Sequence, residues 1–124
     1  MGLGFERGQA MFVERRKHPR FKVSVPVEVC AQFSDAPLHC TTSDISLGGC
    51  YIENMYTYPV GTALELKLRL EDTLLILAKV VTCYPQVGNG IQFEKILPED
   101  EAQLRAFLDG VAKKELAEKE KEIV

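Results

Sequence analysis

The chain has 124 residues, of which 46% are hydrophobic and 27% are charged, and its formal net charge is −3. These values are ordinary for a globular protein and allow a single domain with its own hydrophobic core. No apolar run approaches the ~20 residues that a membrane helix needs, and no apolar segment precedes the first charges as in a signal peptide. We therefore expect a cytoplasmic protein without membrane contact.

The charges are distributed unevenly along the chain. Residues 1–22 contain six Lys or Arg and two Glu, whereas residues 23–93 contain seven acidic and three basic residues. Residues 94–124 are also acidic on balance, with nine acids and six bases. A cationic chain end favours a local anionic ligand over nucleic acid, whose binding requires a basic stripe across the domain.

The positive charge is densest at residues 15–20, whose sequence is RRKHPR. Pro19 fixes its own φ and has no N–H, which disfavours a helix, so we expect an extended or turning arm. Guanidinium groups bind phosphate oxygens and the O6/N7 edge of guanine bidentately. Arg16 and Arg20 are therefore candidate binding residues for an anionic purine ligand. A solvated basic segment is the alternative interpretation.

Alternation of apolar and polar residues predicts six short strands. Pro26 lies on the polar phase of the first strand and cannot donate to a ladder, so we expect an edge or a bulge there. Tight turns between short strands indicate an all-β core, a small closed antiparallel barrel without exposed edges. The expected strands cover residues 21–30, 38–45, 50–52, 62–70, 74–84 and 91–93, with turns at 34–37, 71–73 and 85–90.

The C-terminal part predicts a helix. Pro98 followed by three acidic residues is a typical helix start. Apolar residues then recur at i, i+3, i+4 and i+7, which predicts an amphipathic helix that caps the barrel or pairs with another helix. We expect capping, because one short stripe is too little for a coiled coil. The stripe consists of Leu104, Phe107, Leu108 and Val111.

The expected domain covers residues 14–111, preceded by a flexible segment at 1–13. Residues 112–124 are rich in Lys and Glu and form either a solvated helical extension or a frayed tail. The sequence leaves open whether the protein is a monomer or a homodimer.

The four cysteines show no spacing typical of a zinc site. They lie in apolar, strand-like surroundings, so we expect reduced thiols and no metal site. They are Cys30, Cys40, Cys50 and Cys83.

A second candidate binding element is the sequence DISLGG at residues 44–49. The Asp44 carboxylate can accept hydrogen bonds from N1–H and N2–H₂ of guanine, and Ser46 can donate to a phosphate or orient the loop. Gly48 and Gly49 allow the backbone to approach a ligand closely. The alternative is an ordinary turn in which Asp44 and Ser46 bond to their own backbone.

The chain contains an Arg-x-x-x-Arg arm, an Asp-x-Ser-x-x-Gly turn, a six-strand pattern and a terminal helix. In this order, these features resemble the PilZ domain family of cyclic di-GMP receptors. The resemblance covers roughly residues 14–111, and the segment Gly90-Ile91-Gln92-Phe93 is similar to the glycine-led last strand of that family. It implies a six-stranded antiparallel β-barrel with a C-terminal helix and a ligand on the outer surface of the barrel.

The resemblance also implies roles for individual residues. Arg16 and Arg20 would contact phosphates and the Hoogsteen edge of a guanine, with Arg15 as a third cation. Asp44 and Ser46 would hold a guanine and the flank of the ligand, and Gly49, next to Gly48, would preserve the turn. The protein would then be a cyclic di-GMP effector that closes its arm over the ligand and signals to a partner protein. It would need no cofactor.

The sequence bears on three other functions. A protein-interaction adaptor on the same fold would need no nucleotide. An enzyme is not indicated, because His18 and His39 belong to no base–nucleophile arrangement and no carboxylate cluster could hold a catalytic metal. Nucleic-acid binding is not indicated either, because the tyrosines have no neighbouring Lys or Arg in the sequence.

Overall fold

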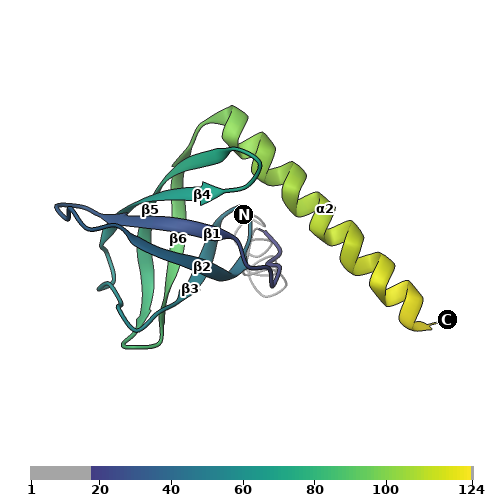
Figure 1. Cartoon of the computed structure of the whole chain (residues 1–124), viewed down its shortest axis with the longest axis horizontal. Coiled ribbons are helices and arrows are strands. Elements are labelled where there is room, and N and C mark those ends of the chain that lie inside the picture. The colour runs from purple at the N-terminus through teal and green to yellow at the C-terminus, as the bar shows by residue number, and fades with distance from the viewer. Residues whose placement is uncertain (1–17, 124) are drawn as a thin grey trace, which may run out of the picture.

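The computed structural model describes residues 18–123, which form a closed six-stranded antiparallel barrel followed by one long helix (Figure 1). The order of the strands around the barrel is β1-β2-β3-β6-β5-β4. The predicted barrel with its C-terminal helix is therefore confirmed. The elements are β1 (Pro26–Ala31), β2 (Leu38–Ile45), β3 (Gly49–Glu53), β4 (Ala63–Arg69), β5 (Thr73–Tyr84), β6 (Gly88–Ile96) and α2 (Pro98–Ile123).

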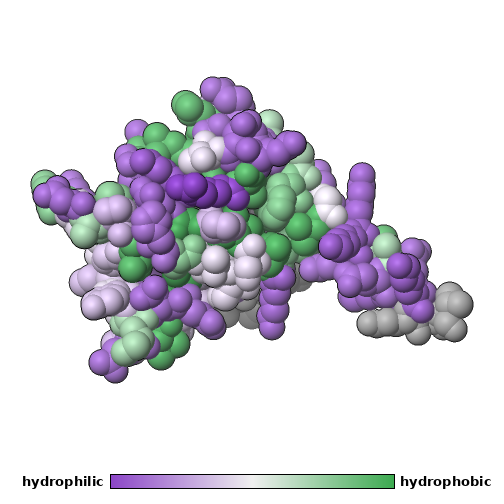
Figure 2. Space-filling model, viewed as in Figure 1, coloured by the Kyte–Doolittle hydropathy of each residue, from purple (hydrophilic) through white to green (hydrophobic). Residues whose placement is uncertain are grey.

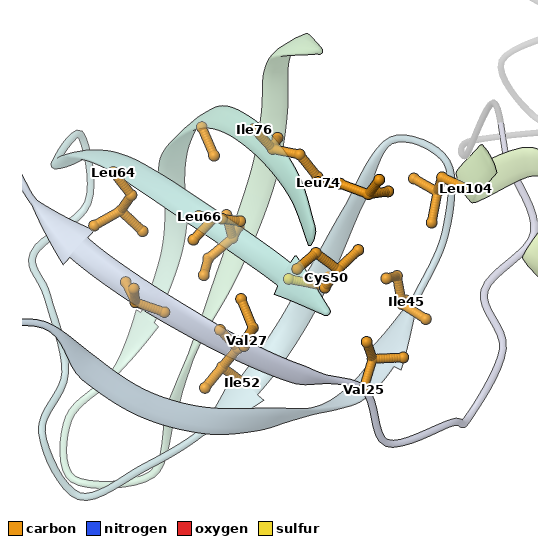
Figure 3. Close-up of a cluster of buried hydrophobic side chains, with 14 of the residues drawn as sticks. Val25, Val27, Ile45, Cys50, Ile52, Leu64, Leu66, Leu74, Ile76 and Leu104 are labelled. Atoms are coloured by element: carbon orange, nitrogen blue, oxygen red, sulfur yellow. The ribbon is translucent and has the colours of Figure 1, made fainter. Parts of the chain in front are cut away.

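The barrel interior is filled by the apolar phase of the alternating strands (Figure 3). In β4, for example, Leu64, Leu66 and Leu68 are buried, while the residues between them are exposed. Full burial of one such side chain stabilises the folded state by roughly 1.5–3 kcal/mol. The period of two therefore both selects the strand conformation and decides which face closes inward.

The helix closes one end of the barrel with its first turns. Leu104 and Leu108 are buried and join the core cluster, with Phe107 partly buried against it. The side chain of Gln103 accepts a hydrogen bond from the Asp72 N–H and donates one to the Asp72 carboxylate, which ties α2 to the β4–β5 turn. Beyond Val111 the helix runs away from the barrel with an exposed, mostly hydrophilic surface (Figures 1 and 2).

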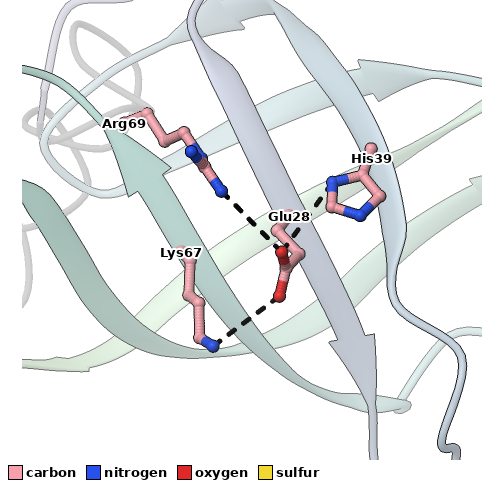
Figure 4. Close-up of polar contacts among 4 residues, drawn as sticks. All are labelled: Glu28, His39, Lys67 and Arg69. Atoms are coloured by element: carbon pink, nitrogen blue, oxygen red, sulfur yellow. Dashed lines mark ion pairs between the residues drawn. The ribbon is translucent and has the colours of Figure 1, made fainter.

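An ion cluster lies on the outer face of the barrel, where β2, β1 and β4 pair (Figure 4). One Glu28 oxygen lies 3.8 Å from His39 Nδ1 and 4.0 Å from Arg69, and the other lies 3.7 Å from Lys67. Such surface pairs contribute about 0–1 kcal/mol each. The position of His39 beside Glu28 is therefore explained by the pairing of β2 with β1.

Two predicted strand boundaries were wrong. The first strand begins at Pro26 instead of Phe21, and Phe21 forms only an isolated bridge with Ile45. Pro26 is the exposed first residue of β1; it pairs with Thr41 of β2 but has no partner in β4, so it lies at a local edge of the closed barrel, a position that tolerates proline.

The last strand was predicted too short, because Gly88, Asn89 and Gly90 were interpreted as turn residues. They belong to β6, which extends over Gly88–Ile96. A Cβ on Gly90 would lie 2.3 Å from Thr82 Oγ1, and the buried Asn89 amide donates to the carbonyls of Tyr58 and Thr82. These residues serve close strand packing, and the turn lies before them at residues 85–87.

Candidate functional site

The basic arm is attached to β2 by backbone and side-chain hydrogen bonds. Phe21 and Ile45 exchange N–H···O bonds of 2.9 and 3.0 Å. The buried Thr42 hydroxyl accepts from the Val25 N–H at 3.0 Å and donates to the Val23 carbonyl at 2.7 Å. These contacts fix the segment just after Arg20 beside the end of β2. The exposed Arg20 is thereby held next to the turn that follows β2.

The turn between β2 and β3 is organised by Ser46. Its hydroxyl accepts hydrogen bonds from the N–H groups of Gly48 and Gly49 at 3.1 and 3.2 Å and lies 3.4 Å from the Gly49 carbonyl. Ser46 is also 6% exposed. These hydrogen bonds orient the loop, and they are also the bonds expected of the ordinary turn that the sequence left as the alternative.

Gly49 sits where β3 and β6 approach most closely. A Cβ there would lie 2.2 Å from the Ile91 carbonyl oxygen, closer than any side chain allows. Gly48 lies under the arm, since a Cβ there would be 3.0 Å from the His18 ring, and its carbonyl accepts from Phe93 N at 2.8 Å. The two glycines thus create a shallow floor between the arm and β6.

Asp44 pairs with Tyr51 of β3, next to a register shift between Thr42 and Asp44. Its Oδ1 is buried without a hydrogen-bond partner within the part of the chain that the structure describes. A buried acceptor without a donor costs about 1–3 kcal/mol, more when it is charged. A donor from a ligand would remove that cost.

Asp44 and Arg20 act on the same buried group. Burial raises the pKa of the Cys50 thiol far above its usual range; the Asp44 carboxylate raises it further and the Arg20 guanidinium lowers it. Both charges therefore lie within electrostatic reach of Cys50. The thiol itself is inert, because a nucleophilic cysteine needs a lowered pKa and access to solvent.

The arm, the turn and β6 enclose a cleft of about 440 Å³. Of the residues predicted from sequence, it brings together Arg20, Ser46, Gly48 and Gly49. Asp44 is close but is not part of the lining, and Arg15 and Arg16 lie outside the described residues. The remaining lining residues, which the sequence prediction missed, are His18, Val81, Ile91, Gln92 and Phe93.

The missed residues follow from barrel closure. Gln92 pairs with Gly49 across β3 and β6, and Val81 stands at a register shift between Val80 and Thr82. The alternation around the buried Ile91 showed that Gln92 faces outward. It did not show which strand pairs with β6. Gln92 lines the cleft because that strand is β3, which carries Gly49.

Two other features are absent from residues 18–123. This range contains no group of three or more His, Cys, Asp or Glu arranged to hold a metal ion. Over the same range, no helix combines the length and the apolar character needed to cross a membrane.

Comparison with known proteins places residues 14–110 in the PilZ domain family, whose model they match. Among solved structures, the Bacillus subtilis inhibitor of motility MotI/DgrA aligns with a TM-score of 0.67 and 19% identity, over 84% of this chain and 53% of that one. The PilZ domain of YcgR from Escherichia coli with c-di-GMP gives 0.65 and 15%, over 87% and 99% of the two chains.

A third structure, the Borreliella burgdorferi PlzA protein in complex with c-di-GMP, gives a TM-score of 0.58 and 18% identity, over 80% of this chain and 43% of that one. The present chain thus spans about half of MotI/DgrA. A search of curated proteins finds no match. At such identities, the structural likeness shows the fold alone.

Proposed function

This chain belongs to the PilZ domain family, and we propose that it is a receptor for cyclic di-GMP that signals to a partner protein. PilZ domains are typically non-catalytic receptors, and structures with this fold include PilZ proteins with bound c-di-GMP. The observation that carries the proposal is the cleft in which Arg20 faces the Ser46–Gly49 turn.

The chemistry of the cleft and of Asp44 beside it suits a ligand that has both phosphates and guanines. Arg20 supplies a fork of donors for phosphate oxygens or a guanine O6/N7 edge. Asp44 offers acceptors for guanine N1–H and N2–H₂, and its Oδ1 has no partner among residues 18–123. Gly48 and Gly49 leave the floor free of side chains.

The arm supplies the signalling step of the proposal. We expect Arg15 and Arg16 to close over the ligand together with Arg20, so that binding orders the segment before Phe21. Ordering costs conformational entropy, and the ordered arm presents a new surface to a partner. Phe21 and Val23 are already hydrogen-bonded to β2, so the arm is anchored to the barrel at its C-terminal end before the ligand binds.

Isothermal titration calorimetry with cyclic di-GMP tests the proposal, with GTP and cyclic GMP as competing nucleotides. We expect saturable binding of cyclic di-GMP alone. Arg16→Ala and Arg20→Ala should each weaken binding at least about tenfold, because hydrogen bonds to charged groups are worth about 1.5–3 kcal/mol.

The matched control is Lys22→Ala. Lys22 is exposed on the same segment but lines a different hollow, against α2. An equal loss in Lys22→Ala and Arg20→Ala would indicate nonspecific attraction by the basic arm. Absence of binding, together with an unshifted melting temperature, would refute the receptor proposal.

A nucleotide-independent adaptor is the second candidate, and one surface favours it. Leu75 and Leu77 are each 44% exposed on the outer face of β5, and Leu97 after β6 is 55% exposed. A partner protein captured equally with and without cyclic di-GMP, and lost in Leu75→Ser/Leu77→Ser, would support this function.

A further inference from the structure

Gln92 and Val81 line the end of the cleft that is formed by β5 and β6. Val80 and Ile91 pair with both side chains buried, so the residues that follow them, Val81 and Gln92, face outward. The register shift after Val80 makes Val81 an extra residue in β5, and 41% of it is exposed. Bulges commonly re-aim side chains at binding sites.

These two side chains can hold a purine base. Val81 offers an apolar surface to a base face, and the Gln92 amide combines a donor with an acceptor at its tip. Gly49 pairs with Gln92, and neither Gly48 nor Gly49 has a side chain, so the cleft beside the amide is lined there by backbone; the Cβ direction of Gly49 is filled by the Ile91 carbonyl. A base could therefore lie on the floor of the cleft with its edge toward Gln92.

Asp44 and Gln92 lie on opposite sides of β3, two strand spacings apart across the sheet and two residues apart along it, which is about 12 Å. This separation suits a ligand with two bases attached to one ring of phosphodiesters. The arm and Asp44 hold one base of such a ligand in the proposed function. The other base would then reach Val81 and Gln92.

Asp44, which lies beside the cleft, and Gln92, which lines it, differ in the bases that they can distinguish. A carboxylate only accepts hydrogen bonds, so Asp44 matches the adjacent N1–H and N2–H₂ of guanine but faces the N1 lone pair of adenine. The Gln92 amide can rotate by half a turn and present its donor and acceptor in either order. It can therefore pair with guanine or with adenine.

The geometry points to an asymmetric site, with a guanine-selective seat at Asp44 and a purine-tolerant seat at Gln92 and Val81, which also accepts the hybrid ligand cyclic GMP–AMP. This inference rests on the proposed function, since it assigns the second base of the same ligand. It extends the ligand class from cyclic di-GMP to cyclic dinucleotides that contain at least one guanine.

Calorimetry of the full chain with cyclic di-GMP, 3′,3′-cyclic GMP–AMP and cyclic di-AMP tests the inference. We expect the hybrid to bind within about tenfold of cyclic di-GMP, and cyclic di-AMP to bind at least about tenfold more weakly than the hybrid. Rejection of the hybrid as strong as that of cyclic di-AMP would overturn the inference. If none of the three binds, the proposed function itself fails.

Variants of Gln92 then test which residue is responsible. Gln92→Glu replaces the amide by acceptors only, so the hybrid should lose at least about fivefold relative to cyclic di-GMP. Gln92→Ala should weaken both ligands by a similar factor. Gln32→Ala, an exposed glutamine outside this cleft, is the control and should change neither affinity. An unchanged affinity ratio in Gln92→Glu would overturn the role of Gln92.

Discussion

The strands β1, β4 and β5 pair with one another in continuous register, whereas the pairs β2–β3 and β5–β6 contain register shifts. On the regular side, buried and exposed side chains alternate along β4 and the first half of β5, although two of the exposed residues of β5, Leu75 and Leu77, are apolar. The irregular side carries the arm, the glycine floor and the cleft. The residues that could bind a ligand thus lie where the sheet departs from its own repeat.

This difference predicts that the two sides respond differently to substitution. A change on the regular side should lower the free energy of unfolding and leave the cleft intact in the folded molecules. A change on the irregular side should alter the cleft for a smaller loss of stability.

The largest loss of stability is expected for Leu66→Ala, on the regular side. Leu66 is fully buried in β4. Removing its methyl groups leaves a cavity and should lower the free energy of unfolding by about 2–5 kcal/mol. Urea denaturation measures this loss, and cyclic di-GMP affinity per folded molecule should stay unchanged. A loss of affinity at low urea would show that the two sides are not separable.

The next largest effect is expected for Gly49→Ala, on the irregular side. The new Cβ would collide with the Ile91 carbonyl, so β3 and β6 must separate, at a cost of about 1–3 kcal/mol. Because Gly49 and Gln92 form the floor of the cleft, ligand affinity should fall together with stability.

Gly110→Ala is the matched control for Gly49→Ala. A Cβ at Gly110 meets no atom within 4 Å, and the residue lies within α2. The change should therefore stabilise the protein by up to about 1 kcal/mol, through helix propensity. Equal melting temperatures for the two alanine variants would contradict the close approach of β3 and β6.

Thr42→Val should detach the arm from the barrel. The substitution keeps the shape of the side chain but leaves the Val25 N–H and the Val23 carbonyl without their partner, at a cost of about 1–3 kcal/mol. We expect faster amide hydrogen exchange at Val25 and weaker ligand binding, because Arg20 is held less firmly. Unchanged exchange at Val25 would rule out Thr42 as the anchor.

The same division explains what the sequence could predict. In β4, the period of two determines the strand and its buried face, because burial of Leu64, Leu66 and Leu68 dominates every local preference. At Gly88–Gly90, local turn preference suggested a loop, but strand packing and the Asn89 hydrogen bonds decided otherwise. Local sequence does not contain those contacts, because they join residues far apart in the chain.

The site was predictable to the extent that its chemistry is local. The turn at Ser46–Gly49 bonds to itself, so its role could be proposed from six consecutive residues. The contribution of β6 depends on which strands are neighbours around the barrel, and that order is a property of the closed sheet. Motif spacing and strand periodicity therefore could not identify Gln92 and Val81 as residues that line the cleft.

The smallest effect concerns the Cys50 thiol beneath the cleft. Burial and the nearby Asp44 raise its pKa in the folded protein, whereas an unfolded cysteine ionises near pH 8.5. Above that pH the unfolded state gains free energy by ionising and the folded state does not, so stability falls as the pH rises. From pH 7.5 to 9.5 the loss is about 1.3 kcal/mol. Urea denaturation across this range should show it in the wild type, and Cys50→Ala should lose less stability by about that amount. An identical pH dependence in both would mean that Cys50 ionises in the folded barrel, and hence that water reaches the core directly under the arm.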